Sequence, residues 1–350
     1  MIKKIATCVP PQFYNFEDKI NWFTKILKEN EIDLFILPQE YFGGNYIMPD
    51  RPTFTKEELL PILEKLSQDT KTGLVVGLVE RENNENYERM WFIDNVFKGE
   101  LTKFAEPAYT VKGKGSYDLV PETDLDKRFQ VFKIKDILLS GYFCWEVYSD
   151  LLFAGLGVLD LDLLVSQIKF GVSMSPKKEE KNGKIEVGGF NHFKDTSWKR
   201  RIEIINEFEV KCPIAISSNS WALPEKAEHL FGIQDVFTKR KYKIANQEQI
   251  ENGVIDIQEL DLEKTRGNRE HWSSYLERTG EMPDGWLREY TMMWKIYNLE
   301  RRLLGKSKDQ LIFEKLKKMR FSRHIQNRSI QTERQRLVRK MKSIKYKNKK

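Results

Sequence analysis

The stretch IKKIATCVPPQFYNFEDKINWFTKILKENEIDLFILPQE, residues 2–40, combines three patterns that together decide the fold. Residues 3–9 have the short apolar pattern of a strand, and residues 32–38 predict a second strand that ends at Pro38. Residues 16–30 between them predict an amphipathic helix whose shared apolar face is Ile20, Phe23, Ile26 and Leu27. The order strand, helix, strand is typical of α/β domains.

The same alternation continues to about residue 265. A second helix is predicted for residues 56–70, and residues 89–104 predict a hairpin that turns at Lys98 and Gly99. Further strands are predicted within 73–80, 130–144 (two strands), 160–167 and 212–219, with a helix over 198–210. We therefore predict a layered α/β domain over residues 1–265.

Composition excludes several classes of protein. Of the 350 residues, 40% are hydrophobic, which is enough for a core, but no apolar run reaches the ~18–20 residues that a membrane span needs. The apolar run at the N-terminus is too short for a signal peptide, so we expect a cytoplasmic protein. The three cysteines are far apart and the histidines are scattered, so we expect no disulfide framework, metal or cofactor. Cys8 and Cys212 lie inside apolar strands and are predicted to be core.

Three segments place a reactive side chain near a strand end or just after a hairpin. Glu40 follows the strand of LFILPQE, Lys103 follows the hairpin, and Cys144 lies in GYFCWE between a strand and a helix-like start. A carboxylate, an ammonium and a thiol are the parts needed for acyl transfer through a thioester. The carboxylate takes the thiol proton, and the ammonium stabilises the oxyanion. A cysteine at a strand end is otherwise more often a small buried apolar residue.

These segments, in this order, resemble the nitrilase (carbon–nitrogen hydrolase) superfamily over residues 1 to about 255. PQE resembles its P-E context with one extra residue, KFAEPAY resembles its K-x-x-L-P-x-Y, and GYFCWE resembles its cysteine context with one residue fewer after the glycine. The resemblance implies an αββα sandwich and a Glu40–Lys103–Cys144 triad. It also implies thiol-dependent hydrolysis of a non-peptide carbon–nitrogen bond, most readily a small linear amide rather than a nitrile, in a homodimer or larger homo-oligomer.

The resemblance also suggests residues around the triad. Tyr41 and Phe42, in the loop after Glu40, are expected to touch substrate, as is Trp145. Glu146 is expected either to support the site or to be an ordinary acid in the first turn of a helix. The family's second glutamate, between lysine and cysteine, has Glu122 as its candidate, with Asp118 as the alternative. Trp198 and Asn219 match a structural tryptophan and a structural asparagine of the family.

The C-terminal segment, residues 266–350, has a different character. It carries 24 Lys and Arg against 9 Asp and Glu, whereas residues 1–265 have an acidic excess. We predict a basic helical extension with a disordered tail. Three roles stay open: binding of nucleic acid or an acidic partner through 306–350, docking on a subunit, or a plain solvated tail. The alternative function is therefore a binding protein that combines a hydrolase-like body with a basic arm.

Overall fold

The computed structural model describes residues 1–13, 15–44, 51–103, 125–148, 161–169, 212–220 and 227–267, together with short stretches and single residues between 119 and 210. The described helices include α1 (Phe16–Glu29), α2 (Lys56–Thr70), α5 (Gln247–Asn252) and the 3-10 helices η1 (Leu125–Arg128) and η2 (Cys144–Tyr148). The described strands are β1 (Ile2–Val9), β2 (Leu34–Ile36), β3 (Gly73–Glu82), β4 (Glu85–Asp94), β5 (Val96–Thr102), β6 (Phe132–Ile134), β7 (Ile137–Phe143), β8 (Leu163–Ile168), β9 (Val172–Ser173), β10 (Glu179–Lys181), β11 (Lys184–Glu186), β12 (Ile214–Ser218), β13 (Ala227–Glu228), β14 (Leu230–Gln234), β15 (Lys243–Ile244) and β16 (Val254–Asp261).

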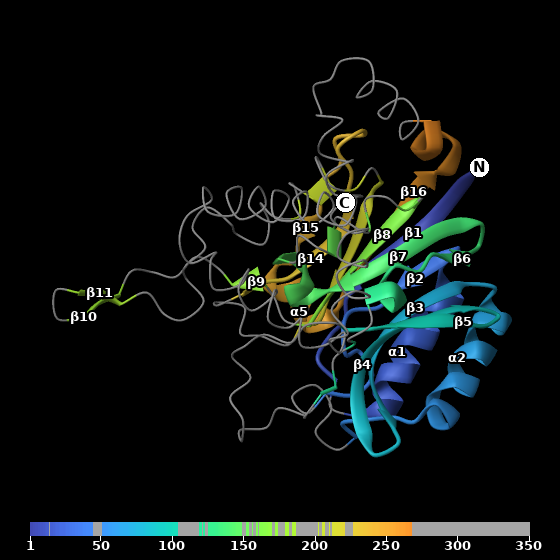
Figure 1. The fold of residues 1–350 in the computed structure, drawn as a ribbon, viewed down its shortest axis with the longest axis horizontal. Helices are drawn as coiled ribbons and strands as arrows, with labels where there is room; N and C mark the ends of the chain where they lie inside the picture. The colour runs from blue at the N-terminus through green and yellow to red at the C-terminus, as the bar shows by residue number, and fades with distance from the viewer. Residues whose placement is uncertain are drawn as a thin grey trace, which may run out of the picture.

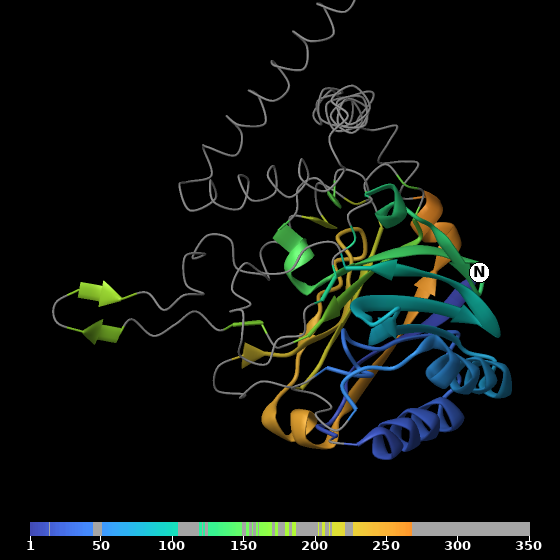
Figure 2. The same ribbon diagram turned by 60° about the horizontal axis from the view of Figure 1, so that its bottom comes forward.

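Two mixed sheets dominate the described part of the chain. The first has the strand order β16-β1-β2-β3-β4-β5 and the second has the order β15-β14-β12-β8-β7-β6. Each sheet has three parallel strands at its centre, β1, β2 and β3 in the first and β7, β8 and β12 in the second. The outer strands pair antiparallel. Figures 1 and 2 show the two sheets stacked, with α1 and α2 along the outer side of the first sheet.

The alternation of side chains along β1 and β2 builds two layers of core at once. Ile5, Leu34 and Ile36 join the apolar cluster between the two sheets. Cys8 and Phe35 point the other way, into the cluster under α1 and α2. Because successive side chains of a strand lie on opposite faces, a strand covered on both sides is apolar on both, as β2 is and as the buried half of β1 is apart from Thr7.

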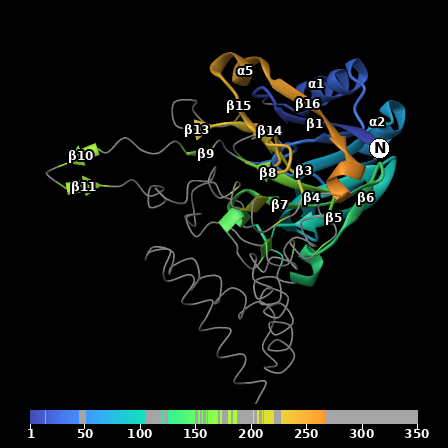
Figure 3. The ribbon, with the colours of Figure 1, turned by 90° about the horizontal axis from the view of Figure 1, so that it is seen from above.

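The helical layer of the first sheet is set by ordinary helix signals. The side chain of Asn15 accepts a hydrogen bond from the Asp18 N–H at 2.8 Å and so caps α1. Phe23 and Leu27, on the predicted apolar face of α1, are buried. Figure 3 shows α1 and α2 lying along one outer face of the stacked sheets.

The outer face of the second sheet is covered as well. Side chains from the segments between the strands pack there in one cluster with Ile214 and Ile216 of β12; they are Leu152, Phe153, Leu156, Ile202 and Ile205. The predicted αββα class is therefore confirmed. Cys8 and Cys212 are buried, as predicted for core residues.

The predicted hairpin turn at Lys98 and Gly99 is wrong. β4 and β5 turn at Asn95, which has a φ of +60°, a left-handed conformation that asparagine tolerates. Gly99 instead lies within β5 opposite Phe92, beside an irregularity in the register. A Cβ on Gly99 would lie 2.4 Å from the Phe132 ring, so a close approach, not a turn, requires glycine here.

The predicted basic extension falls almost wholly on residues 268–350, which lie outside the described residues. Arg266, one residue past the predicted boundary, pairs with Asp162 of the body through a 2.6 Å contact between Nη2 and Oδ2. The boundary itself stays a prediction. None of the helices in the described ranges is long and apolar enough to cross a membrane.

Candidate active site

The topology brings the three predicted catalytic residues to one edge of the sandwich. Strand β5 is antiparallel to β4, which is antiparallel to β3, so β5 runs in the same direction as β2. Glu40 after β2 and Lys103 after β5 therefore lie at the same edge of the first sheet. Cys144 lies directly after β7 in the second sheet, at the start of η2.

Lys103 is buried and ion-paired. Its Nζ lies 2.7 Å from Oε2 of Glu88 in β4, and its backbone N–H donates to the Glu88 carbonyl at 2.8 Å. Met90 and Leu101, two residues from Glu88 and Lys103, belong to the cluster between the sheets. By strand alternation, both charged side chains therefore face the second sheet, where Cys144 lies.

Cys144 lies among charges of both signs. It is 6% exposed, and burial raises the pKa of its thiol to about 11. Lys103 counteracts burial and lowers this pKa, as do a hydrogen bond from the Lys169 backbone N–H and the charge of the Lys169 side chain; Glu88 raises it. The resting group is therefore a thiol, and forming the thiolate requires a proton acceptor.

Lys169 connects this cysteine to Glu40. It follows β8, and its Nζ lies 2.5 Å from Oε1 of Glu40, which is fully buried. Burial lowers the pKa of Lys169, but Glu40 and then Glu88 outweigh burial, so its pKa is raised and it is charged. Glu40 has a φ of +54°, a left-handed backbone that costs free energy for a residue with a side chain.

Hydrogen bonds from the second sheet hold the segment that leads to Glu40. Ser217 of β12 donates to the Ile36 carbonyl at 2.7 Å, and Gln167 of β8 donates to the Leu37 carbonyl at 2.7 Å. Asn219, predicted as a structural residue, donates to the carbonyl of Gln39 at 2.5 Å. The segment that carries Glu40 is therefore positioned by both sheets. Trp198 lies outside the described residues.

Two predicted substrate contacts lie elsewhere. Tyr41 and Phe42 belong to the apolar cluster under α1 and α2, whereas Cys144 belongs to the cluster on the second sheet. The Tyr41 hydroxyl donates to the backbone carbonyl of Lys19 at 2.9 Å, and the two rings pack edge to face. Since the chain turns at Glu40, the residues after it run under the helices rather than into the site.

The other predicted neighbours differ in their placement. Glu146 is fully buried, with its Oε2 2.6 Å from Nη2 of Arg128, and it accepts the N–H of Phe143 at 2.8 Å. It thus supports the backbone of the residue before Cys144. The N–H of Glu122 donates to the Lys103 carbonyl at 2.8 Å, which places Glu122 beside Lys103. The side chain of Trp145 and the whole of Asp118 lie outside the described residues.

Three charged residues around Glu40, Lys103 and Cys144 were not predicted from the sequence. Glu88 lies in a β-hairpin strand and Lys169 follows the apolar run of β8, positions at which a charge is ordinary. Lys19 lies in α1 and is buried; its Nζ donates to the Tyr41 carbonyl at 2.6 Å, and burial lowers its pKa to about 7 while Glu40 opposes that effect. The position of Lys19 on the apolar side of a predicted helix could have identified it in the sequence as a buried lysine.

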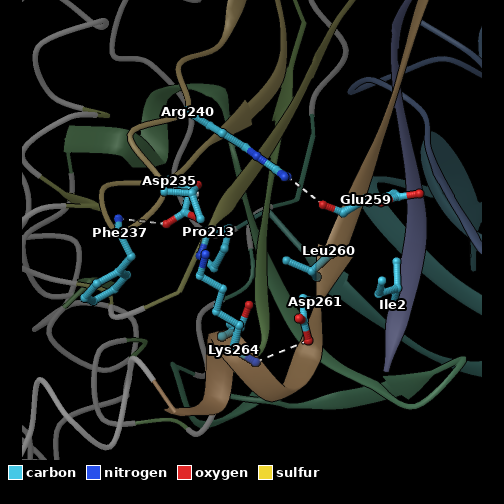
Figure 4. Close-up of a pocket in the computed structure, with 11 residues that line it drawn as sticks. Ile2, Pro213, Asp235, Phe237, Arg240, Glu259, Leu260, Asp261 and Lys264 are labelled. Atoms are coloured by element: carbon cyan, nitrogen blue, oxygen red, sulfur yellow. Dashed lines mark hydrogen bonds between the residues drawn. The ribbon is translucent and has the colours of Figure 1, made fainter.

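A separate pocket of about 230 Å³ lies at the opposite edge of the first sheet. It is lined by Ile2 at the start of β1, by Leu260 and Asp261 of β16, and by Arg240, whose Nη1 donates to the Glu259 carbonyl (Figure 4). Since β1 and β2 are parallel, the start of β1 is remote from Glu40. Within the described part of the chain, no group of three or more His, Cys, Asp or Glu could hold a metal ion.

Comparison of the structure with solved structures gives one consistent fold. A CN-hydrolase superfamily protein from Xanthomonas campestris, solved with an arsenic adduct in its active site, matches with a TM-score of 0.57 at 10% identity over 79% of this chain and 97% of that one. A carbon–nitrogen hydrolase from Helicobacter pylori matches at 0.54 and 14% identity, over 82% of this chain and 99% of that one. Nit3 of Saccharomyces cerevisiae, a nitrilase superfamily member, matches at 0.54 and 13% identity, over 77% and 94%.

The chain thus has the fold of the nitrilase (carbon–nitrogen hydrolase) superfamily, as its sequence resemblance predicted. No family sequence profile matches the chain, and no curated protein matches it in sequence.

Proposed function

We propose that this protein hydrolyses a non-peptide carbon–nitrogen bond, most readily that of a small linear amide, through a thioester on Cys144. One observation carries the proposal. Cys144 lies within electrostatic reach of Lys103 and Lys169, and Lys169 is ion-paired with Glu40, so that groups from four separate strand ends share one buried edge of this fold.

The chemistry follows from the roles of these groups. The Glu40 carboxylate takes the proton of the Cys144 thiol, and the thiolate attacks the amide carbonyl carbon. Lys103 stabilises the oxyanion. The carbon–nitrogen bond breaks, and the amine leaves with the proton held by Glu40. Water then loses a proton to Glu40 and attacks the thioester; the carboxylic acid leaves and the proton returns to the thiolate.

The fold of the structural neighbours supports the reaction class, since those named are carbon–nitrogen hydrolases or nitrilase superfamily members. The choice of an amide over a nitrile rests on the family resemblance. We also propose that the protein forms a homodimer or larger homo-oligomer, as that resemblance implies.

The test is release of ammonia from a panel of primary amides and nitriles by the full-length protein. Cys144→Ala should reduce turnover at least about a thousandfold, because no other group replaces the nucleophile. Mass spectrometry of the acid-quenched wild type should show an acyl adduct on the peptide that contains Cys144.

Cys212→Ala is the matched control, because Cys212 is a buried thiol of the same apolar cluster but precedes β12, at the opposite end of the parallel strands from Cys144. It should retain turnover. Full activity in Cys144→Ala, with unchanged thermal unfolding, would contradict the assignment of Cys144 as the nucleophile.

The charge of residues 266–350 favours a second function. With 24 basic against 9 acidic residues, this segment is suited to phosphate contacts, which require no sequence motif. We therefore propose nucleic-acid or acidic-partner binding through 306–350 as an additional property of the chain.

A further inference from the structure

Lys169 lies next to two groups of the candidate catalytic triad at the same time. Because Phe143 of β7 pairs with Gln167 of β8, Lys169 lies beside Cys144, and its backbone N–H and its charge both lower the pKa of the Cys144 thiol. Its side-chain Nζ lies 2.5 Å from Oε1 of Glu40. The single residue after β8 thereby lies beside Cys144 and is ion-paired with Glu40.

We propose that Lys169 is a positioning residue that fixes the Cys144 thiol and the Glu40 carboxylate relative to each other and supplies the second cation of the site. The inference rests on the proposed function for the roles of Cys144 and Glu40. Glu40 and Cys144 come from different sheets, so a further residue is needed to hold them in a fixed relative position.

Charge balance explains why a second cation is needed here. The carboxylates of Glu40 and Glu88 are both buried, and Lys103 is already paired with Glu88. Lys169 balances Glu40. Without Lys169, a thiolate at Cys144 would form in a site whose two carboxylates are opposed by a single paired ammonium, and burial of unbalanced charge is costly.

Lys19 does not provide a substitute. It approaches the same region from α1 and interacts with Glu40, but its Nζ donates to the Tyr41 carbonyl on the helix side of the first sheet. Burial lowers its pKa to about 7, so part of the population is neutral at physiological pH. Among the described residues, the charged groups that act on the Cys144 thiol include Lys103 after β5, Glu88 of β4 and Lys169 after β8.

The experiment measures the reactivity of the Cys144 thiol rather than turnover of a substrate. Full-length protein is treated with iodoacetamide, a neutral reagent, over a range of pH, and alkylation of the Cys144 peptide is followed by mass spectrometry. Lys169→Met should slow alkylation of Cys144 about tenfold at any pH below the midpoint of the curve of alkylation rate against pH, because a nearby positive charge that favours the thiolate is lost. Lys169→Arg should restore the wild-type profile.

Two controls define the result. Lys25→Met removes an exposed lysine of α1 and should leave the profile unchanged. Glu88→Gln should shift the profile in the opposite direction, with faster alkylation at a given pH, because Glu88 raises the pKa of the Cys144 thiol. If Lys169→Met does not fold, Lys169→Gln carries the same test, because it keeps a hydrogen-bond donor without the charge.

A wild-type alkylation profile in both neutral variants would overturn the proposal, as would an equal change in Lys25→Met. This outcome is separate from that of the proposed function. If no amide or nitrile is turned over but Lys169→Met slows alkylation, the hydrolase assignment fails while the placement of Lys169 beside the thiol stands. If turnover depends on Cys144 but Lys169→Met does not change alkylation, the hydrolase assignment stands and the proposed role of Lys169 fails.

Discussion

At the scale of single residues, the site consists of buried charges that hold one another in place. Lys103 and Lys169 lower the pKa of the Cys144 thiol, yet burial outweighs them and keeps it at about 11. A thiol in this state does not react indiscriminately at neutral pH. Its activation therefore depends on a base, and the base that we propose is Glu40, which is ion-paired with Lys169.

A prediction at this scale concerns Lys19. Burial lowers its folded-state pKa to about 7, against about 10.4 in an unfolded chain. Between these values the unfolded state binds more protons, so the free energy of unfolding should rise with pH over this window, by at most about 1.4 kcal/mol per pH unit from this group. Below pH 7 the penalty for burying the charge is fully present.

Lys19→Met lacks this group, so the wild type should gain stability relative to the variant as pH increases from about 7 to 10. Urea unfolding of both proteins at several pH values in that window measures the difference. Lys25→Met, on the exposed face of the same helix, should follow the wild type. Parallel curves for the wild type and Lys19→Met would contradict the prediction.

At the scale of elements, the short strand β2 and the turn after it are held by contacts from both sheets. The carbonyls of Ile36, Leu37 and Gln39 accept hydrogen bonds from β8 and from the end of β12. On the other side, Gly77 of β3 lies so close that an added Cβ would be 2.3 Å from the Pro38 carbonyl oxygen and 2.7 Å from Gln39 Cα. The close approach explains a glycine in the middle of an otherwise apolar strand.

Gly77→Ala should therefore displace the segment before Glu40. We expect a loss of roughly 1–3 kcal/mol in the free energy of unfolding, as for other overpacked positions, together with reduced turnover. Thermal unfolding and amide hydrolysis measure the two effects. Gly267→Ala is the matched control, since no atom lies within 4 Å of its added Cβ, and it should change neither. A fully stable and active Gly77→Ala would show that this contact does not position the base.

At the scale of the whole molecule, we propose separate functions for the described body and for the basic segment. The body forms two stacked sheets, and Glu40, Lys103 and Cys144 follow strands of these sheets. The described chain runs through Arg266, which is anchored on Asp162. A truncation intended to keep the body intact should therefore end after Gly267 rather than at the sequence boundary of 265.

Deletion of residues 268–350 should remove affinity for nucleic acid and leave the Cys144 chemistry unchanged. For the full chain, binding to a labelled duplex should weaken steeply as salt increases, because phosphate contacts release counterions. Fluorescence anisotropy at low and physiological salt measures this, with thermal unfolding as a check on the truncated body. A full-length protein without affinity at low salt would exclude the binding role.

Much of the fold follows from local patterns. Apolar alternation located β1, α1, β2, α2 and most later strands, because a strand buried on both faces and a helix buried on one have different periods. The turn at Asn95 was misplaced because glycine is the commoner turn signal, and nothing local shows that Gly99 is needed for a neighbouring ring. Tyr41 and Phe42 were assigned to the site because the left-handed turn at Glu40 has no clear signature in sequence.

By itself, the sequence determined the layered class of this protein and indicated Glu40, Lys103 and Cys144 as the candidate carboxylate, ammonium and thiol, since these depend on residue type and on patterns within one segment. Only the tertiary structure decided that Glu88 pairs with Lys103, that Lys169 joins Glu40 to Cys144, and that Glu146 pairs with Arg128 behind the site. These pairs join residues from 15 to 129 positions apart in the chain, and in the sequence a charged residue at such a position resembles any solvated one, because only folding buries it beside its partner.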